Sequence, residues 1–239
     1  MDLGIAGKVA LVTAASKGLG RASAHALSEE GARVVICARG EDALKAAAAE
    51  MPGEVHAVVA DVTRPEVPQQ LVDATVERFG GLDILVANAG GPPPGRALEV
   101  DDDALRAAVE ANLLTSVRLV RSSAPHMRAR GWGRICLITS YSIKQPIPTL
   151  ALSNVARTGL WAWAKTAAAD LFPDGITLNL ACPGVHATDR MKQLGGLGVG
   201  AHGDPGDFGR IVAFLCSEPT RFVSGVALPV DGAAIVGLL

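Results

Sequence analysis

The sequence predicts one α/β domain over residues 1–239, built on a doubly wound parallel sheet of about seven strands. Apolar runs of strand length alternate with segments of helical periodicity along the whole chain, as repeated β-α-β units require. Most of these runs are continuous in Val, Ile and Leu, which is typical of strands buried on both faces. The hydrophobic fraction of 49% is ample for the core of such a fold, and no linker or repeat divides the chain.

Each element is assigned from the length and period of its segment. Acids at Asp101 to Asp103 favour the first turn of one helix, and Thr63 followed by Pro65 marks the start of another. The predicted strands are Val9–Thr13, Arg33–Cys37, Val55–Val59, Leu82–Ala87, Arg134–Thr139, Ile176–Leu180 and Ala227–Val230. The predicted helices lie near residues 19–30, 41–51, 65–79, 101–123, 152–171 and 207–217.

Two irregular segments follow predicted strand ends, where open α/β sheets bind their ligands. One is the glycine and proline run at residues 90–95, and the other is a glycine-rich stretch from about residue 185 to 207. A loop as long as the second is usually functional in a compact domain. We therefore expect a substrate lid at about 185–207, with an ordinary surface loop as the alternative.

The composition excludes several classes of function. Acidic and basic residues are interspersed with a net charge of −2, so no basic surface for nucleic acid or anionic membrane is expected. The four cysteines are widely spaced without a CxxC pair, which predicts buried free thiols and no metal site. The chain shows no basic, apolar leader and no apolar run of about 18 residues. A cytoplasmic protein without membrane or nucleic-acid partners is expected.

A glycine-containing turn follows the first predicted strand. It reads Thr13-Ala14-Ala15-Ser16-Lys17-Gly18-Leu19-Gly20 and leads into the first predicted helix. Glycines in such a turn let the backbone approach a pyrophosphate, whose charge then meets the helix N-terminus. The placement at the start of a β-α-β unit therefore predicts a dinucleotide-binding turn.

This turn resembles the Thr-Gly-x-x-x-Gly-x-Gly turn of the short-chain dehydrogenase/reductase family, with Ala14 in place of the first glycine. If that position requires a positive φ, alanine is strained there. Further motifs resemble those of the family and occur in the family's order across nearly the whole chain. They are Asp61-Val62, Asn88-Ala89-Gly90, Asn112, Ser140, Asn179 to Gly184 with Thr188, Ser224-Gly225 and Val230-Asp231-Gly232.

The resemblance implies a Rossmann-type domain that binds a nicotinamide cofactor. The cofactor-binding residues it implies are Thr13, Ser16, Lys17, Gly18, Leu19, Gly20, Arg39, Asp61, Val62, Asn88, Ala89, Gly90, Arg157, Pro183, Gly184 and Thr188. Proteins of this fold that bind NAD(H) carry an acidic residue at the end of the second strand. Here that stretch contains Arg39 and no acidic residue. Because Arg39 and Lys17 could pair with a 2′-phosphate, we expect NADP(H) in preference to NAD(H).

The catalytic set departs from the family's pattern. The family pairs a tyrosine acid with a lysine four residues later, and the matching positions hold Ser153 and Arg157. An aliphatic hydroxyl is much less acidic than a tyrosine, whose pKa is about 10, and a guanidinium is not a proton shuttle. The resemblance assigns substrate orientation to Ser140 and a water relay to Asn112. Ser153 either packs or orients substrate, and we expect Arg157 to contact the cofactor.

Another group must then supply the proton. His186 follows the Pro183-Gly184 segment and titrates near neutral pH, so it is the preferred candidate, with an ordinary packed histidine as its alternative. Tyr141, the chain's sole tyrosine, follows Ser140 but should point to the opposite side. Water is a further donor. The weaker candidates on the same loops are Lys144, Gln145, Asp189, Arg190 and His202.

These departures also resemble a divergent branch named 3-oxoacyl-carrier-protein reductase-like, through residues 90–95, Lys144 to Pro146 and Leu152 to Asn154 with Arg157. Three functions follow as hypotheses. The first is an NADP(H)-dependent oxidoreductase acting on a carbonyl or alcohol of a small to medium, fairly apolar substrate. The second is a redox-neutral dehydratase, isomerase or cyclase, and the third is a catalytically silent NADP(H)-binding protein. The resemblance also implies a homodimer or homotetramer.

Overall fold

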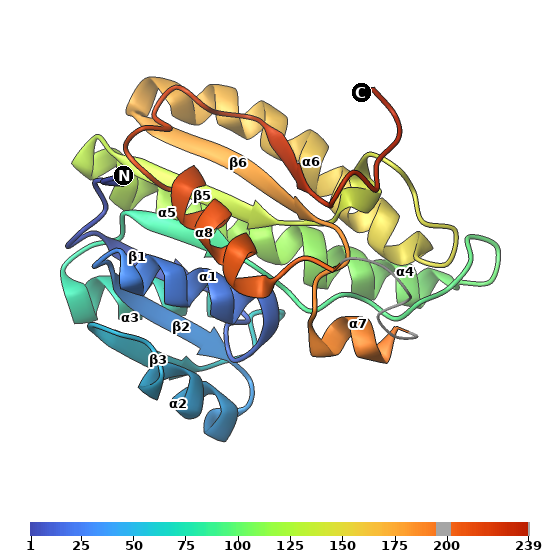
Figure 1. Cartoon of the computed structure of the whole chain (residues 1–239), viewed down its shortest axis with the longest axis horizontal. Coiled ribbons are helices and arrows are strands. Elements are labelled where there is room, and N and C mark those ends of the chain that lie inside the picture. The colour runs from blue at the N-terminus through green and yellow to red at the C-terminus, as the bar shows by residue number, and fades with distance from the viewer. Residues whose placement is uncertain (195–201, 239) are drawn as a thin grey trace.

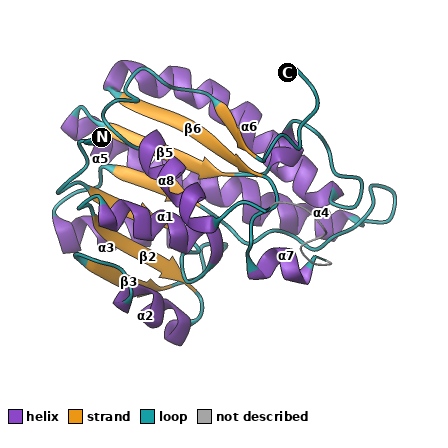
Figure 2. Ribbon diagram, viewed as in Figure 1, coloured by secondary structure: helices purple, strands orange, loops and turns teal. Residues whose placement is uncertain are grey.

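Seven parallel strands form a single sheet in the order β3-β2-β1-β4-β5-β6-β7. The computed structural model describes residues 1–194 and 202–238. Figure 2 shows helices on both faces of this sheet. The strands are β1 (Val9–Val12), β2 (Arg33–Ala38), β3 (Val55–Val59), β4 (Ile84–Ala87), β5 (Gly133–Ile138), β6 (Ile176–Pro183) and β7 (Ala227–Val230). The predicted fold class and all seven strands are thereby confirmed, with bounds that differ by up to three residues.

The helices divide between the two faces of the sheet. They are α1 (Gly18–Glu29), α2 (Glu41–Ala49), α3 (Val67–Phe79), α4 (Asp102–Val109), α5 (Thr115–Arg130), α6 (Ala151–Leu171), α7 (Asp189–Gln193) and α8 (Pro205–Leu215). One core cluster joins the sheet to α3, α5 and α6, and the other joins it to α1, α2 and α8. In β1, Leu11 belongs to the first cluster while Ala10 and Val12 belong to the second. Side chains that alternate between two apolar layers explain why the strands are continuous apolar runs.

Two of the helices begin at an aspartate whose side chain caps the first turn. The Asp101 carboxylate accepts a 2.8 Å hydrogen bond from the Ala104 N–H, which confirms the predicted start of α4. Asp204 caps α8 in the same way, with Pro205 in the first turn. The helix predicted from residue 65 begins instead at Val67.

The helix predicted at 101–123 is a longer composite. α4 leads into a five-residue π-helical segment, Glu110–Leu114, and then into α5, which continues through Pro125 to Arg130. Two short 3₁₀ turns, Tyr141–Ile143 and Phe172–Asp174, flank α6. No helix in the described part of the chain is long and apolar enough to cross a membrane.

The order in which successive strands are added to the sheet reverses between β1 and its neighbour β4. From β1 the chain passes outward through β2 and β3, and it then returns to build the other half of the sheet from β4. Figure 1 shows α7 beyond the edge to which the strand arrowheads point. Ligands of open α/β sheets bind in the crevice at this edge, next to such a switch point.

Candidate active site at the carboxyl edge of the sheet

The turn between β1 and α1 is tied to the end of β4. The Thr13 hydroxyl donates a 2.7 Å hydrogen bond to the Asn88 carbonyl and accepts a 2.9 Å bond from the Asn88 N–H. The Asn88 side-chain amide donates to the Ala14 carbonyl at 3.2 Å. A Cβ on Gly20 would lie 2.5 Å from that carbonyl oxygen, so no larger residue fits there without movement. These contacts fix the turn at the switch point of the sheet.

Ala14 adopts a left-handed conformation with φ of 49°. The position that resembles the family's first glycine therefore does require a positive φ. An L-residue in this region costs about 1–2 kcal/mol. The turn nevertheless keeps its shape, because Thr13 and Asn88 hold it from both sides.

The predicted lid begins directly over this turn. Gly18 also has a positive φ, and a Cβ on it would lie 3.7 Å from the Thr188 Cγ2 atom. Thr188 precedes α7, a helix that was not predicted because five residues carry no periodicity. Of the stretch expected to form the lid, residues 195–201 lie outside the described residues.

The corner at the end of β2 carries Arg39, which is expected to pair with the 2′-phosphate of the cofactor. Arg39 is exposed, and its charge helps to lower the pKa of the Asp61 carboxyl. The largest causes of that lowered pKa are hydrogen bonds to Asp61 from the Thr63 hydroxyl and N–H, at 2.8 and 3.1 Å. Arg39 and Asp61 thus lie near each other, with Lys17 exposed before α1.

Helix α6 carries Ser153 and Arg157, the two residues expected from the sequence at the family's tyrosine and lysine positions. Ser153 and Arg157 are one turn apart and each is 7% exposed. The Nη1 atom of Arg157 donates to the carbonyls of Ile138 at 2.9 Å and Thr139 at 3.2 Å. Burial lowers the pKa of Arg157 to about 10, and the charge of Arg190 contributes to this shift. Arg157 therefore fixes the end of β5, immediately before Ser140.

Ser140 and Tyr141 follow β5 and are both half-buried. The Ser140 hydroxyl accepts a 3.1 Å hydrogen bond from the Ser142 N–H. Among the described residues it donates no hydrogen bond, so its proton is available to a bound oxygen. Tyr141 begins the 3₁₀ turn and stands beside Ser140 in the chain, as expected.

Asn112 lies in the π-helical segment, which packs against α6. Its amide donates to the Ala108 carbonyl at 3.4 Å. Its Oδ1 atom is buried and has no partner among the described residues. A buried acceptor of this kind calls for a water or ligand donor, which fits the water relay that the resemblance implies for Asn112.

His186 lies at the base of the expected lid and is 4% exposed. Its ring packs edge-on against Phe208 of α8 with centroids 5.1 Å apart, and its Nδ1 atom lies 3.3 Å from the Gly184 carbonyl. Gly203 pairs with His186 in an isolated bridge and has no room for a Cβ against the ring. The geometry favours the packed histidine over the preferred acid-base role, because the enclosed ring offers substrate almost no surface.

The two irregular segments meet through Arg190. Its Nη2 atom donates a 2.6 Å hydrogen bond to the Pro92 carbonyl, which joins α7 to the loop after β4. The two segments lie 98 residues apart in the chain, so no local signal predicted this contact. Arg190, a weak candidate in the sequence, is thus brought to the site.

Other weak candidates are held by neighbouring elements. The Lys144 ammonium lies 5.2 Å from the centre of the Trp161 ring. The Gln145 side chain donates to Ala234 and accepts from the Val236 N–H. The loop that contains Gln145 is therefore joined to the C-terminal segment.

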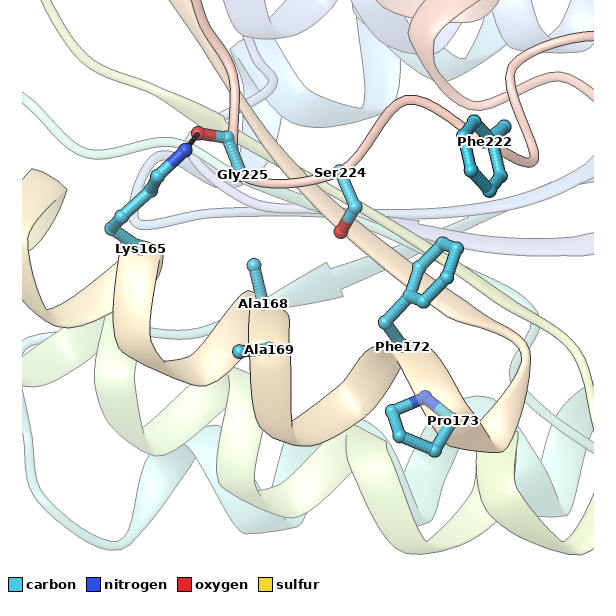
Figure 3. A pocket seen from close by; sticks show the side chains of 8 residues that line it. All are labelled: Lys165, Ala168, Ala169, Phe172, Pro173, Phe222, Ser224 and Gly225. Carbon is cyan, nitrogen blue, oxygen red and sulfur yellow. Dashed lines mark hydrogen bonds between the residues drawn. The ribbon is translucent and has the colours of Figure 1, made fainter.

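A cavity of about 430 Å³ lies near the C-terminal end of α6, at the far end of the helix from Ser153. Figure 3 shows Lys165 donating to the Gly225 carbonyl on one side, at 3.1 Å, and Phe172 facing Phe222 on the other. The two rings meet edge to face at 5.8 Å. This cavity does not include any of the expected catalytic or cofactor residues.

Known proteins are similar to this chain in sequence and in fold. A family model described as enoyl-(acyl carrier protein) reductase matches residues 13–233. Dehydrogenase/reductase SDR family member 4 from Homo sapiens is 32% identical over 245 residues, which cover 95% of this chain and 87% of the relative.

Solved structures are similar over nearly the whole chain. L-sorbose reductase from Gluconobacter frateurii, complexed with NADPH and L-sorbose, is 33% identical with a TM-score of 0.92 and full coverage of both chains. A variant of actinorhodin polyketide ketoreductase with NADPH is 31% identical with a TM-score of 0.87, covering 95% of this chain and 96% of that one.

Proposed function

The chain belongs to the short-chain dehydrogenase/reductase family of oxidoreductases, and on that premise we propose that it is an NADP(H)-dependent carbonyl reductase. It would reduce a carbonyl, or oxidise the corresponding alcohol, in a small to medium substrate with an apolar body. The observation that carries this proposal is the intact turn at the switch point, where Thr13, Asn88 and Gly20 form a cradle that a Cβ would fill. The L-sorbose and polyketide reductases with NADPH support the choice of cofactor.

The chain's residues fit a dinucleotide along this edge. Residues 18–20 would present backbone N–H groups to the pyrophosphate. Arg39, next to Asp61, would pair with the 2′-phosphate. When bound, the cofactor supplies or accepts the hydride. Positioning by the protein accounts for a large share of such catalysis.

Ser140 would bind the substrate oxygen, because its hydroxyl accepts from the Ser142 N–H and keeps its own proton to donate. Ser153 is buried on α6 one helical turn before Arg157, and within the described residues its hydroxyl makes no hydrogen bond. A serine is shorter than a tyrosine by a whole ring, which leaves room for a water. We infer that a water held by Ser153 donates the proton, since His186 is enclosed. Tyr141 is the second candidate donor, because it adjoins Ser140 and is half-buried.

The absence of the tyrosine and lysine also favours a second function, a redox-neutral enzyme on the same scaffold. NADPH oxidation against a panel of ketones and β-ketoacyl thioesters separates the two. We expect turnover that Ser140→Ala lowers by about 100-fold, in the range of one transition-state donor, while Thr158→Ala on the exposed side of α6 does not.

Tyr141→Phe separates the two donors, because it leaves turnover unchanged if water donates the proton. NADPH binding without turnover of any carbonyl would remove the reductase proposal in favour of the redox-neutral one. We further propose, from the resemblance, a homodimer or homotetramer.

A further inference from the structure

Among the described residues, Arg157 is a buried cation without an acidic partner. Its side chain is 7% exposed, and burial is the largest cause of its lowered pKa. The second cause is another cation, Arg190, and no carboxylate raises the pKa of Arg157 in return. Charged groups are buried in proteins when they are paired, because an isolated buried charge is costly. The site is therefore short of one negative charge.

The hydrogen bonds of Arg157 leave one edge of its guanidinium open. Nη1 carries two hydrogens, and the carbonyls of Ile138 and Thr139 accept both. Within the described residues, Nε and Nη2 donate to no other group. These two atoms form the side-on edge of the guanidinium, whose parallel N–H groups match the two oxygens of a carboxylate.

Arg190 brings the second positive charge. Its position is fixed by the hydrogen bond from Nη2 to the Pro92 carbonyl. The neighbouring acid, Asp189, lies 3.4 Å from the Lys192 ammonium instead. Arg190 forms no salt bridge in the part of the chain that the structure describes. Arg157 of α6 and Arg190 of α7 thus lie close enough for the charge of Arg190 to lower the pKa of Arg157, and among the described residues neither has an acidic partner.

We propose that Arg157 and Arg190 form a carboxylate-binding subsite, and that the substrate is an oxo acid whose carboxylate lies one or two carbons from its carbonyl. This inference deepens the proposed reductase function and rests on it. With Arg157 at the end of β5, next to Ser140, such a carboxylate lies beside the reacting carbonyl. The ribose hydroxyls that the resemblance assigns to Arg157 are neutral, so they would leave the charge of Arg157 uncompensated. The apolar body of the substrate extends away from the arginines.

The first test compares oxo acids with their neutral esters in NADPH oxidation. The pairs are benzoylformate with its methyl ester and acetoacetate with its methyl ester. A charge-assisted hydrogen bond contributes about 1.5–3 kcal/mol, so we expect kcat/KM for each acid to exceed that of its ester by about 10- to 150-fold. Equal values for acid and ester would overturn the proposal.

Matched variants locate the effect. Arg190→Gln should raise KM for the acids about 10-fold and bring the acid-to-ester ratio towards unity. Lys192→Gln removes one positive charge from the same helix without touching the subsite, and the ratio should stay at the wild-type value. If the acid-to-ester ratio of kcat/KM falls equally in both variants, the effect is one of general charge, and the subsite is refuted.

A binding measurement separates this inference from the reductase function. Calorimetry with benzoate and benzamide, which are not reduced, should show binding of benzoate alone, with loss of binding in Arg157→Met and Arg190→Gln. If Arg157→Met does not fold, Arg190→Gln decides. Benzoate binding without turnover of any carbonyl would support the carboxylate-binding subsite and refute the reductase function. Turnover of neutral ketones without benzoate binding would support the reductase function and refute the carboxylate-binding subsite.

Discussion

Replacing Gly20 with alanine tests the turn between β1 and α1 directly. Gly20 has a φ that any residue adopts, so backbone strain is not at issue. The obstacle is space: the added Cβ would lie 2.5 Å from the Ala14 carbonyl oxygen and 2.6 Å from the Asn88 Nδ2 atom. The change therefore forces apart the two residues whose 3.2 Å hydrogen bond joins the turn to β4.

The expected loss of stability follows from three terms. Overpacking against the Ala14 carbonyl costs about 1–3 kcal/mol. Loss of the Asn88 hydrogen bond costs about 1 kcal/mol. Alanine is favoured over glycine inside a helix by about 1 kcal/mol, which offsets part of the cost. The free energy of unfolding should fall by about 1–3 kcal/mol, and Tm by about 2–12 °C for a chain of this size.

Urea unfolding and NADPH titration would measure both effects. NADPH affinity should fall together with stability, because the displaced carbonyl lies in the turn that receives the pyrophosphate. Gly40→Ala is the matched control: Gly40 has a negative φ of −94° and open space around its Cβ position. A Gly20→Ala protein with wild-type stability and wild-type NADPH affinity would refute this account of the turn.

Three further predictions concern charge and burial. Arg39→Leu should lower NADPH affinity by about 10- to 150-fold, as expected for one charge-assisted pair, and leave NADH affinity unchanged; equal losses for both cofactors in calorimetry would contradict this. Asp83 is 2% exposed and its carboxylate binds the Val9 N–H at 2.9 Å and Arg130 at 2.8 Å. Asp83→Asn should therefore lower the free energy of unfolding by about 1–3 kcal/mol, and an unchanged urea midpoint would be inconsistent with that role. Burial raises the pKa of the Cys37 thiol to about 12, so the reactive thiolate is scarce at pH 8. Cys37 should react with a thiol reagent only above its folded pKa or after denaturation, and labelling within minutes at pH 8, read by mass spectrometry, would count against its burial.

Sequence patterns predicted the sheet well because its inner strands, from β1 and β4 to β5 and β6, are buried on both faces. Continuous apolar runs such as that of β1 carry this information locally, and Asp101 marks the start of α4 by its capping side chain. The π-helical segment at Glu110–Leu114 has no such signal, since its residues suit an ordinary helix equally well. The end of α5 was also missed, because Pro125 reads as a stop although the helix continues to Arg130.

The site was predictable where it is built from one turn or one helix face. Thr13 and Asn88 follow neighbouring strands, and Ser153 and Arg157 share a face of α6. The surroundings of His186 were not predictable, because Phe208 reaches its ring from a separate helix. The link from Arg190 to Pro92 likewise depends on tertiary packing.

Titration of the protein with NADPH and with NADH tests the central claim most directly, since every further step depends on the cofactor site. The account predicts binding of NADPH about 10-fold or more tighter than NADH, as one charge-assisted contact to the 2′-phosphate requires. Tighter binding of NADH would contradict the role of Arg39. No binding of either nucleotide would mean that the turn containing Ala14 is not a cofactor site, and the reductase function would have to be abandoned.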